Sequence, residues 1–421
     1  MSKEFVEQIG NIEEEPVTIR ETLVRGVAKD EEGMSLIMPD YSSLEKAMSE
    51  RRLKLYLGID PTSPELHIGH TVPLRKLRQF QDLGHEVNLL FGTFTGMIGD
   101  PTDKSATRIR LTKNQINQNV ADYKEQAGKI LDLSPDAKNK INIVYNHEWL
   151  APINFEGVLD LASNVTVQQM LERKTFKERI DSGKAVSLTE FLYPILQGYD
   201  SVAMEVDLEV GGKDQIFNML VGRDFVKRYL NKEKWVLPTR LIEDPNGKKM
   251  GKTEGNIVNM RDLPEVIYEG IMTWPDSAIY MGFELITSVP MEQILIINEK
   301  LSNGELDPMA TKEALAFRVT QELQGTDAAI YAREEFQRVK REGQLPRRIK
   351  ETVIQRGSKI SEILLLSGLC KTKEEAVAKV AQKSIFIDGQ QSQKDIIWPE
   401  NASTIQIGKK TIKNVRLVVL K

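Results

Sequence analysis

Cysteine is nearly absent from this chain of 421 residues, in which Cys370 is the only one. A single cysteine excludes an intramolecular disulfide and a zinc site made of cysteines, and it fits a reducing compartment, so we expect the cytoplasm. No apolar run approaches the roughly 20 residues of a membrane-spanning helix, so we expect no membrane partner. The N-terminal stretch MSKEFVEQIGNIEEEP is too acidic for a transit peptide and lacks the apolar core of a signal peptide.

The net charge is unevenly distributed, negative over most of the chain and positive at its end. Residues 358–421 carry 11 Lys and Arg against 6 Asp and Glu, a net charge of +5, whereas the whole chain carries −4. Residues 1–357 therefore carry −9. A basic end on an acidic body indicates a polyanionic partner for the end, although a solvated surface explains the same charge equally well. The length is sufficient for two or three domains.

The hydrophobic pattern of residues 53–95 predicts a strand, a helix and a second strand. Apolar residues alternate over residues 53–59, which is the period of a strand, and residues 86–95 form an apolar run. Between them, from Gly69 to Gly84, apolar residues recur with the spacing of a helix face. A strand–helix–strand unit predicts a parallel sheet, in which ligands gather where strands end and helices begin.

The following residues alternate between helical and strand-like segments. Residues 110–190 look mostly helical, and strand-like runs return at residues 202–210 and 235–242. Asp307 and Pro308 are typical of a helix start, within a small helical region that follows these strands. The sequence contains no internal repeat and no low-complexity segment.

Two of only four histidines stand at the start of the first predicted helix, in His67-Ile68-Gly69-His70. A metal site needs three or four ligands, and few candidates are left in the chain, namely Cys370, His85 and His147, so we predict no metal site. The electrostatic interpretation is that a helix start and imidazole N–H groups stabilise charge on a phosphate. Gly69 would let a flat base pack on the backbone. A purely structural role for the histidine pair is the third interpretation.

These four residues resemble the HIGH signature of class I aminoacyl-tRNA synthetases letter for letter. The partner of that signature, a KMSKS loop, is expected after the last strands of the same domain, where GKKMGKTEGN (residues 247–256) lies. The loop keeps two lysines and the methionine but departs at both serines, with Lys249, Met250 and Lys252 against Gly251 and Thr253. Alone, this turn fits an exposed hairpin; in order with the first motif, it favours the resemblance. The resemblance implies catalytic roles for His67, His70, Lys249, Lys252 and Thr253.

Over nearly its full length, the chain is similar to bacterial tyrosyl-tRNA synthetases. The matching stretches are LYLGIDPT before the HIGH signature, FTGMIGDPTDK at 94–104, EFLYPILQGYD at 190–200 and GGKDQ at 211–215. The resemblance implies a tyrosine site made of Tyr56, Asp100, Tyr193, Gln197, Asp200 and Gln215. It implies an ATP site made of Gly58, Asp60, His67, Gly69, His70, Gly212, Asp214 and Lys252.

The resemblance also divides the tyrosine site into two ends. Tyr56 and Asp200 would meet the phenol hydroxyl, which needs an acceptor and can use a donor. Asp100, Tyr193 and Gln197 would bind the α-ammonium, and Gln215 would lie near the carboxylate. Taken singly, Tyr56 fits a half-buried strand residue and Asp200 a surface carboxylate at a helix end.

The end of the chain resembles an S4-type RNA-binding module, with an apolar helix, a turn, a second helix with lysines, and a strand that ends in Asp388-Gly389. Four lysines are the candidate tRNA contacts, namely Lys371, Lys373, Lys379 and Lys383, and contacts of this kind position RNA without reading its sequence. The implied fold is α/β, and its parts are a Rossmann-like parallel-sheet catalytic domain (1–262, with the helical insertion at about 110–190), a helical anticodon-binding-type domain (263–345), a linker (346–357) and an α+β S4-like domain (358–421).

Together the resemblances imply a tyrosine–tRNA ligase, which activates L-tyrosine with ATP to tyrosyl-adenylate, releases pyrophosphate and transfers tyrosyl to the terminal ribose of tRNA(Tyr). They imply ATP with Mg²⁺ as a substrate complex, no tightly bound cofactor, a homodimer and no DNA partner. Two alternatives stay open. One is a tryptophanyl enzyme of similar fold, against which the Tyr56 and Asp200 pair and the S4-like end speak. The other is an RNA-binding homologue without catalysis, against which the HIGH signature and the loop lysines speak.

Overall fold

The structure is a computed structural model of the chain, and it describes residues 2–100, 111–243, 258–392, 394–408, 412 and 415–420. The chain divides into two compact units, each made of two stretches, residues 1–261 with 274–311 and residues 262–273 with 312–421. Each unit has its own sheet of five strands. Within the part of the chain that the structure describes, no helix has the length and apolar character to cross a bilayer.

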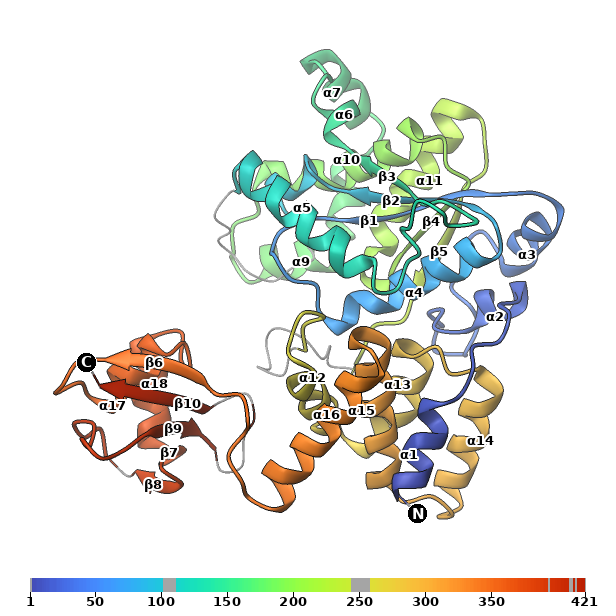
Figure 1. Cartoon of the computed structure of the whole chain (residues 1–421). Coiled ribbons are helices and arrows are strands. Elements are labelled where there is room, and N and C mark those ends of the chain that lie inside the picture. The colour runs from blue at the N-terminus through green and yellow to red at the C-terminus, as the bar shows by residue number, and fades with distance from the viewer. Residues whose placement is uncertain are drawn as a thin grey trace. The chain divides into compact units, whose positions relative to one another are not determined.

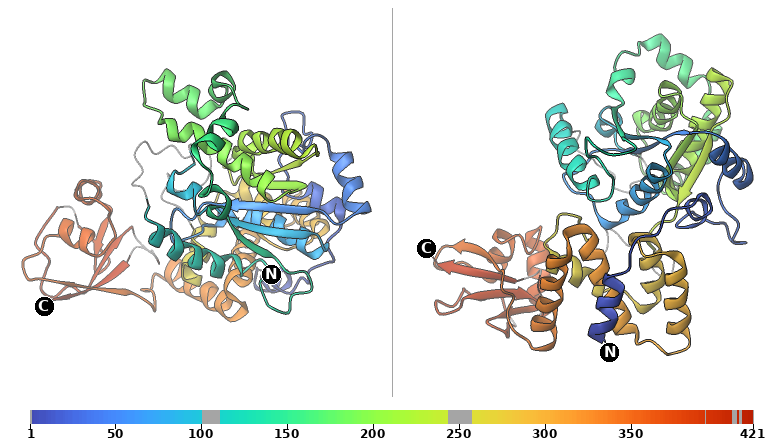
Figure 2. Two further views of the ribbon diagram at one scale, coloured as in Figure 1. Left: turned by 90° about the horizontal axis from the view of Figure 1, so that it is seen from above. Right: turned by 45° about the vertical axis from the view of Figure 1, so that its right-hand side comes forward.

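The first unit is built around five parallel strands in the order β3-β2-β1-β4-β5 (Figure 1). These strands, which lie side by side in the view from above (Figure 2), are β1 Lys54–Ile59, β2 Glu86–Phe91, β3 Asn142–Tyr145, β4 Leu208–Gly212 and β5 Trp235–Thr239. The chain moves outwards from β1 through β2 to β3 and then returns to the other side of β1. The strand order therefore reverses between β1 and β4, and the crevice at such a point is where parallel sheets bind ligands.

Helices cover both faces of this sheet. α4 Ile68–Asp82 joins β1 to β2 on one face, and α10 Leu188–Ala203 and α11 Ile216–Leu230 pack together on the other (Figure 1). Right-handed crossovers produce this arrangement, because the two halves of the sheet are wound in opposite directions. The other described helical segments of this unit are α1 Ser2–Gly10, α2 Ile19–Val24, α3 Tyr41–Glu50, η1 Thr95–Met97, α5 Lys113–Ala127, α6 His147–Leu150, α7 Phe155–Ala162, α8 Val167–Leu171, α9 Lys174–Asp181, η2 Lys213–Gln215, η4 Asp276–Ala278, α13 Ile279–Ile286 and α14 Met291–Ser302.

The predicted strand–helix–strand unit is confirmed as β1, α4 and β2, and Gly84 follows α4 with a φ of +84°. The two segments that follow have different outcomes. Residues 110–190 are mostly helical, as predicted, and the structure adds the short edge strand β3 among these helices. Residues 202–210 are not one strand, because α10 continues to Ala203 and β4 begins only at Leu208. Packing of α10 on α11 prevails there over the local alternation of apolar residues.

The second unit has a mixed sheet in the order β6-β10-β9-β7-β8, in which β6 and β10 are parallel and the other pairs antiparallel. Its elements are α12 Pro264–Met272, α16 Thr326–Phe336, η5 Gln337–Arg341, β6 Lys350–Ile354, α17 Ile360–Leu366, α18 Lys373–Ala381, β7 Ile385–Ile387, β8 Gln390–Ser392, β9 Thr404–Ile407 and β10 Val415–Leu420, and α15 Pro308–Gln324 spans the boundary at residues 311–312. Two helices followed by strands agree with the predicted α+β end, whose core includes the buried Cys370 and Trp398.

The strand β6 lies inside the segment 346–357 that the sequence predicts to be a linker. Thr352 and Ile354 are 8% and 2% exposed, whereas the other three residues of β6 are exposed. This alternation of buried and exposed residues is typical of a strand. The linker prediction rested on the basic residues in and around this segment. Residues 350–354 are therefore part of the sheet, and the other domain boundaries stay predictions.

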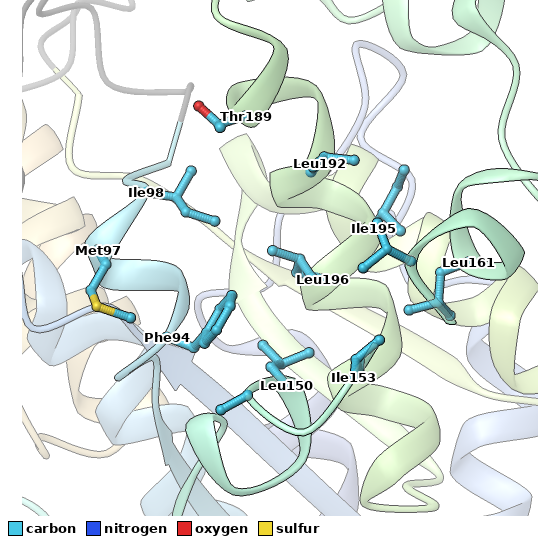
Figure 3. Close-up of a pocket in the computed structure, with 12 residues that line it drawn as sticks. Phe94, Met97, Ile98, Leu150, Ile153, Leu161, Thr189, Leu192, Ile195 and Leu196 are labelled. Carbon is cyan, nitrogen blue, oxygen red and sulfur yellow. The ribbon is translucent and has the colours of Figure 1, made fainter. Parts of the chain in front are cut away.

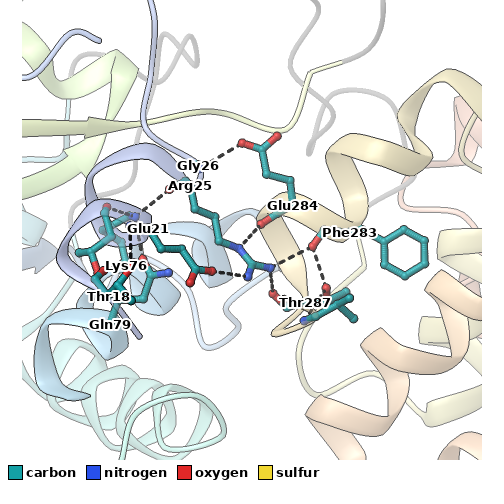
Figure 4. Close-up of polar contacts among 11 residues, drawn as sticks. Thr18, Glu21, Arg25, Gly26, Lys76, Gln79, Phe283, Glu284 and Thr287 are labelled. Atoms are coloured by element: carbon teal, nitrogen blue, oxygen red, sulfur yellow. Dashed lines mark hydrogen bonds and ion pairs between the residues drawn. The ribbon is translucent and has the colours of Figure 1, made fainter. Parts of the chain in front are cut away.

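The N-terminal segment is fastened to α4 by a buried lysine (Figure 4). Lys76 is 3% exposed, and its Nζ donates to the backbone oxygen of Thr22, to that of Arg25 at 2.7 Å and to Oε1 of Gln79 at 2.7 Å. Arg25 in turn donates through Nε to the backbone oxygen of Glu284 on α13 at 2.9 Å. Burial, with a smaller contribution from the Arg25 charge, lowers the pKa of Lys76 to about 7.

Candidate active site

Two histidines cap the start of α4 reciprocally, at the edge of the sheet where β1 ends. His67 Nδ1 accepts a hydrogen bond from the backbone N–H of Gly69 at 3.1 Å, and His70 Nδ1 accepts one from the backbone N–H of His67 at 3.1 Å. The two ring centroids lie 3.9 Å apart with the planes at 43°. The side chains thus satisfy N–H groups that a helix start leaves without backbone partners.

These hydrogen bonds assign the tautomer of both rings. A neutral imidazole has one acceptor nitrogen and one N–H, and in each ring Nδ1 is the acceptor, so the proton is on Nε2. Both rings therefore carry an Nε2–H donor at a helix start, where the helix dipole favours phosphate. Gly69 is required for this geometry, because a Cβ there would lie 2.9 Å from Cε1 of His67. This requirement adds to the role that the sequence predicts for Gly69.

Asp60 lies directly after β1 and is held on both oxygens. The Tyr193 hydroxyl on α10 donates to Oδ2 at 2.8 Å, and the Thr95 hydroxyl donates to Oδ1 at 2.7 Å. Burial, followed by the charge of Asp60, raises the pKa of Tyr193. Gly92 makes this possible, because a Cβ there would lie 1.9 Å from Oδ1 of Asp60. The structure thus brings two predicted residues together, and it adds Thr95 and Gly92, which the sequence analysis missed.

Asp200 and Tyr56 are both buried, but their hydrogen bonds go to other residues. Asp200 is 2% exposed and accepts from Trp149 Nε1 at 2.7 Å and from Asn146 Nδ2 at 3.3 Å. Burial raises the pKa of the Asp200 carboxyl, and these two hydrogen bonds oppose the shift only in part. The Tyr56 hydroxyl pairs with the Ser201 hydroxyl at 3.0 Å. Burial also raises the pKa of Tyr56, and nearby carboxylates add to the shift.

A buried ion pair lies next to Tyr56. Lys234 and Glu209 are 0% and 2% exposed and are in direct contact, and Lys234 Nζ also donates to the Ser201 hydroxyl at 2.8 Å. Burial lowers the pKa of Lys234, and the Glu209 charge opposes that shift. The sequence analysis missed this pair. The sequence does contain an indication of it, because a glutamate stands inside an apolar strand run. Burying that carboxylate in a sheet covered on both faces is costly unless its charge is paired.

Asp100, which follows η1, accepts hydrogen bonds from Arg173 Nη2 at 3.1 Å and from Gln215 Nε2 at 2.5 Å. The Gln215 amide connects in turn to Asn218 and through it to Gln197. The structure therefore joins three predicted residues, Asp100, Gln197 and Gln215, in one chain of hydrogen bonds. Arg173 and Asn218 were not predicted, and no local motif marks either of them.

The remaining predicted residues of the ATP site lie on the two strands that flank the crevice. Gly58 is in β1, Gly212 ends β4, and Asp214 is in η2 directly after β4. A Cβ at Gly212 would approach Oδ1 of Asp214 to 2.5 Å, so this glycine lets the aspartate fold back on the strand end. β1 and β4 are neighbours in the sheet, and residues that follow them share its carboxyl edge.

Two groups of predicted residues lie elsewhere. Lys249, Lys252 and Thr253 of the KMSKS-like loop are outside the described residues. The candidate tRNA contacts belong to the second unit, on α18 and the residues next to it, where Lys371, Lys373 and Lys383 are exposed and Lys379 is half-buried. Their roles stay predictions.

An apolar cavity of about 300 Å³ lies against another side of α10 (Figure 3). Its lining comes from η1 and its flanks, α6, α7 and α10, and includes Phe94, Leu150, Leu161 and Leu196. Among the described residues that line it, none is a predicted tyrosine-site residue. The apolar cavity is therefore separate from the hydrogen-bonded residues of α10 described above.

Comparison with known proteins shows which family and which proteins the chain resembles. Residues 48–339 match the family model described as tRNA synthetases class I (W and Y). The chain is 38% identical over 393 residues to tyrosine–tRNA ligase 2 of Vibrio cholerae serotype O1, an alignment that covers 93% of this chain and 98% of that protein. It is also 38% identical over 370 residues to the tyrosine–tRNA ligase of Thermotoga maritima, with 87% and 91% covered.

Solved structures resemble the fold. A C-terminally truncated mitochondrial tyrosyl-tRNA synthetase of Aspergillus nidulans gives a TM-score of 0.62 at 22% identity, covering 80% of this chain and 99% of that one. The tyrosyl-tRNA synthetase of Archaeoglobus fulgidus complexed with L-tyrosine gives 0.57 at 20% identity, covering 75% and 100%. These likenesses confirm the predicted α/β architecture.

Proposed function

The chain belongs to the class I tRNA synthetases of the tryptophan and tyrosine group, and from this membership and the geometry of the site we propose that it is a tyrosine–tRNA ligase. The protein activates L-tyrosine with ATP and transfers the tyrosyl group to tRNA(Tyr). The observation that carries the proposal is the reciprocal capping of α4 by His67 and His70, which leaves an Nε2–H donor on each ring at the start of this helix.

The first step takes place on the phosphates of ATP, which enters with Mg²⁺ as its substrate complex. The carboxylate of tyrosine attacks the α-phosphorus, the bond to the bridging oxygen breaks, and pyrophosphate leaves. His67 and His70 hydrogen-bond the phosphate oxygens through Nε2–H as negative charge moves towards the leaving group. The protein forms no covalent bond in this step, so its contribution is positioning and charge stabilisation. Lys249 and Lys252 serve the leaving pyrophosphate.

Tyrosine is held at both of its polar ends. Its phenol hydroxyl lies near Asp200, which Trp149 and Asn146 hold in place, and Tyr56 lies beside it in the same interior. Its α-ammonium lies near Asp100, Tyr193 and Gln197, because a cation needs carboxylate and oxygen acceptors. Asp60 and Asp214 serve the ribose side of the bound adenylate.

The second step brings the terminal ribose of tRNA(Tyr) to the adenylate. Its hydroxyl oxygen attacks the carbonyl carbon of the tyrosyl group, and AMP leaves. The exposed lysines around α18 contact the tRNA backbone through its phosphates.

The protein acts as a homodimer. Large apolar side chains are exposed on α7 and at the start of α10, where Phe155, Leu159 and Leu188 are 76%, 55% and 78% exposed. The same two helices line the apolar cavity through Val158 and Thr189, so these side chains flank one region. Large exposed apolar side chains that gather in one region are typical of a protein interface. Sedimentation equilibrium of the wild type and of Leu188→Asp tests this, and a wild-type monomer would overturn it.

ATP–pyrophosphate exchange with each amino acid tests the activity. The expected result is exchange that depends on tyrosine, with phenylalanine and tryptophan far weaker. Preference for tryptophan would favour the other enzyme of this family, and no exchange with any amino acid would favour a homologue without catalysis. His85→Asn is a matched control for variants of the HIGH histidines, because His85 Nδ1 also accepts a backbone N–H, from Leu53 at 3.2 Å, away from the start of α4.

A further inference from the structure

Asn218 joins two glutamines that belong to the proposed tyrosine site. Its Nδ2 donates to Oε1 of Gln197 at 2.9 Å and to Oε1 of Gln215 at 2.8 Å. Asn218 is fully buried in the first turn of α11, whereas both glutamines are half-buried. A primary amide has two N–H donors, so Asn218 uses both of them on these two neighbours.

Each glutamine then donates to a carboxylate at its far side. Gln197 Nε2 donates to Oε1 of Glu209 at 3.0 Å, and Gln215 Nε2 donates to Oδ2 of Asp100 at 2.5 Å. Glu209 is ion-paired with Lys234, and Asp100 with Arg173, and both carboxylates accept from the glutamine N–H₂ groups. The chain of hydrogen bonds thus has an acceptor at each end and a double donor in its middle.

This arrangement leaves only one direction for every amide. If either glutamine turned over, its oxygen would face a carboxylate and its N–H₂ would face the N–H₂ of Asn218. If Asn218 turned over, its oxygen would face both glutamine oxygens. The Oδ1 of Asn218 is buried without a hydrogen-bond partner in the described structure, so the donors rather than the acceptor determine how this side chain lies.

We propose that Asn218 is a positioning residue that makes the proposed site selective for the α-ammonium of tyrosine. It turns the Gln197 oxygen, which keeps a second lone pair, towards the position of the ammonium, and it keeps the Gln215 N–H₂ on the side of Asp100 and the substrate carboxylate. A site with the amides reversed would meet the ammonium with N–H groups. This inference rests on the proposed function.

Asn218→Asp replaces the double donor between the two glutamines by an acceptor, with almost no change in the shape of the side chain. A carboxylate at position 218 accepts from both glutamines, and their oxygens then face Glu209 and Asp100. The buried charge at position 218 is costly, but the two glutamine N–H₂ groups and the helix dipole in the first turn of α11 offset part of this cost. Asn139→Asp is the matched control. Asn139 also donates through Nδ2, to the backbone oxygen of Gln81 at 2.9 Å, but it takes no part in the series of hydrogen bonds around Asn218.

The experiment is calorimetric titration of the full-length protein with L-tyrosine and with 3-(4-hydroxyphenyl)propionate, which keeps the phenol and the carboxylate but lacks the ammonium. In Asn218→Asp the Kd for tyrosine rises by about tenfold or more, the scale of a hydrogen bond to a charged group. The Kd for the propionate rises clearly less, because this ligand has a carboxylate for Gln215 but no ammonium for Gln197. In Asn139→Asp neither Kd changes by more than about threefold, on the same scale.

An equal rise for both ligands in Asn218→Asp means a merely structural role and overturns the proposal, as does an unchanged tyrosine Kd. If Asn218→Asp does not fold, Asn218→Ser, which keeps one donor, replaces it under the same criteria. Failure of the proposed function looks different: the wild type, titrated with L-tryptophan as well, would not prefer tyrosine to tryptophan. The two failures are therefore distinguishable in one set of titrations.

Discussion

The backbone N–H of His67 donates to Nδ1 of His70 at 3.1 Å, so the second histidine fixes the first residue of the motif as well as its own ring. The Nδ1 of His67 accepts from the backbone N–H of Gly69, and the backbone N–H of His70 donates to the backbone oxygen of His67 at 2.9 Å. The two rings consequently have different tasks in the fold but the same tautomer. This makes the structural and the chemical role of His70 separable by substitution.

His70→Asn separates them. Asparagine Oδ1 can accept the backbone N–H of His67, so the cap survives, but the side chain is too short to place a donor where Nε2–H was. Adenylate formation, measured by rapid quench, falls by about 10²–10³-fold, the loss for one preorganised donor. The tyrosine Kd stays within about twofold, because the ground state is bound elsewhere. A rate equal to that of His85→Asn would contradict the phosphate role.

A second prediction concerns recognition of the phenol hydroxyl. Tyr56→Phe and Ser201→Ala remove the same hydrogen bond from its two sides, but only Tyr56→Phe removes the phenol hydroxyl of the protein. If Tyr56 meets the substrate, Tyr56→Phe lowers discrimination of tyrosine against phenylalanine by about 0.5–1.5 kcal/mol more than Ser201→Ala does. The measurement is the ratio of kcat/KM for the two amino acids in ATP–pyrophosphate exchange. Equal ratios in the two variants would remove Tyr56 from the recognition set.

Asp200→Asn is expected to lower the same ratio further than either variant, because a charged or strongly polar acceptor for the phenol is lost. Trp149 and Asn146 donate to the two oxygens of the Asp200 carboxylate. The asparagine amide has one oxygen, so it can accept only one of these two hydrogen bonds in the same geometry. A ratio unchanged in Asp200→Asn would place the phenol elsewhere in the fold.

A third prediction concerns tRNA binding. Replacing Lys371, Lys373, Lys379 and Lys383 by glutamine removes four positive charges from α18 and its flanks. If these lysines contact phosphates, the slope of log K against log salt becomes shallower by about 0.7–0.9 for each lost contact. Lys138→Gln with Lys140→Gln, both exposed lysines of the first unit, is the control. Tyrosine-dependent ATP–pyrophosphate exchange stays unchanged in both proteins; an unchanged slope in the fourfold variant would contradict the tRNA role.

The sequence identifies the centre of the site because that centre is local. The strand period before Asp60 and the histidines at the helix start are adjacent in the chain, so β1, α4 and the HIGH signature can be predicted together. Gly69 illustrates the limit even there: the clash of a Cβ with His67 follows from a ring position that the sequence does not contain.

The supporting residues depend on contacts between distant segments. Asn146 and Trp149 follow β3, which pairs with β2, and they reach Asp200 from more than 50 residues away along the chain. The register of parallel strands is not a local property, so no motif marks these donors. Asn218 is likewise recognisable only when the directions of four hydrogen bonds are known.

The last prediction uses the buried lysine on α4. Burial lowers the pKa of Lys76 to about 7 in the folded state, against 10.5 for an ordinary lysine. Between these values the unfolded chain holds one more proton than the folded one, so the free energy of unfolding rises with pH, by at most about 1.4 kcal/mol per pH unit from this group. Below pH 7 both states hold the proton and the slope disappears.

The measurement is urea unfolding of the wild type and of Lys76→Met from pH 6 to pH 9, in steps of about half a unit, fine enough to resolve a slope of this size. Lys76→Met loses the hydrogen bonds to the backbone oxygens of Thr22 and Arg25, so it is less stable throughout, but it has no proton to exchange at this position. The difference in unfolding free energy between the two proteins therefore grows in favour of the wild type above pH 7. Lys46→Met, at a lysine whose side chain is 73% exposed, gives a difference that does not change with pH. A constant difference for Lys76→Met as well would mean that Lys76 stays charged in the fold, held by the backbone oxygens it contacts.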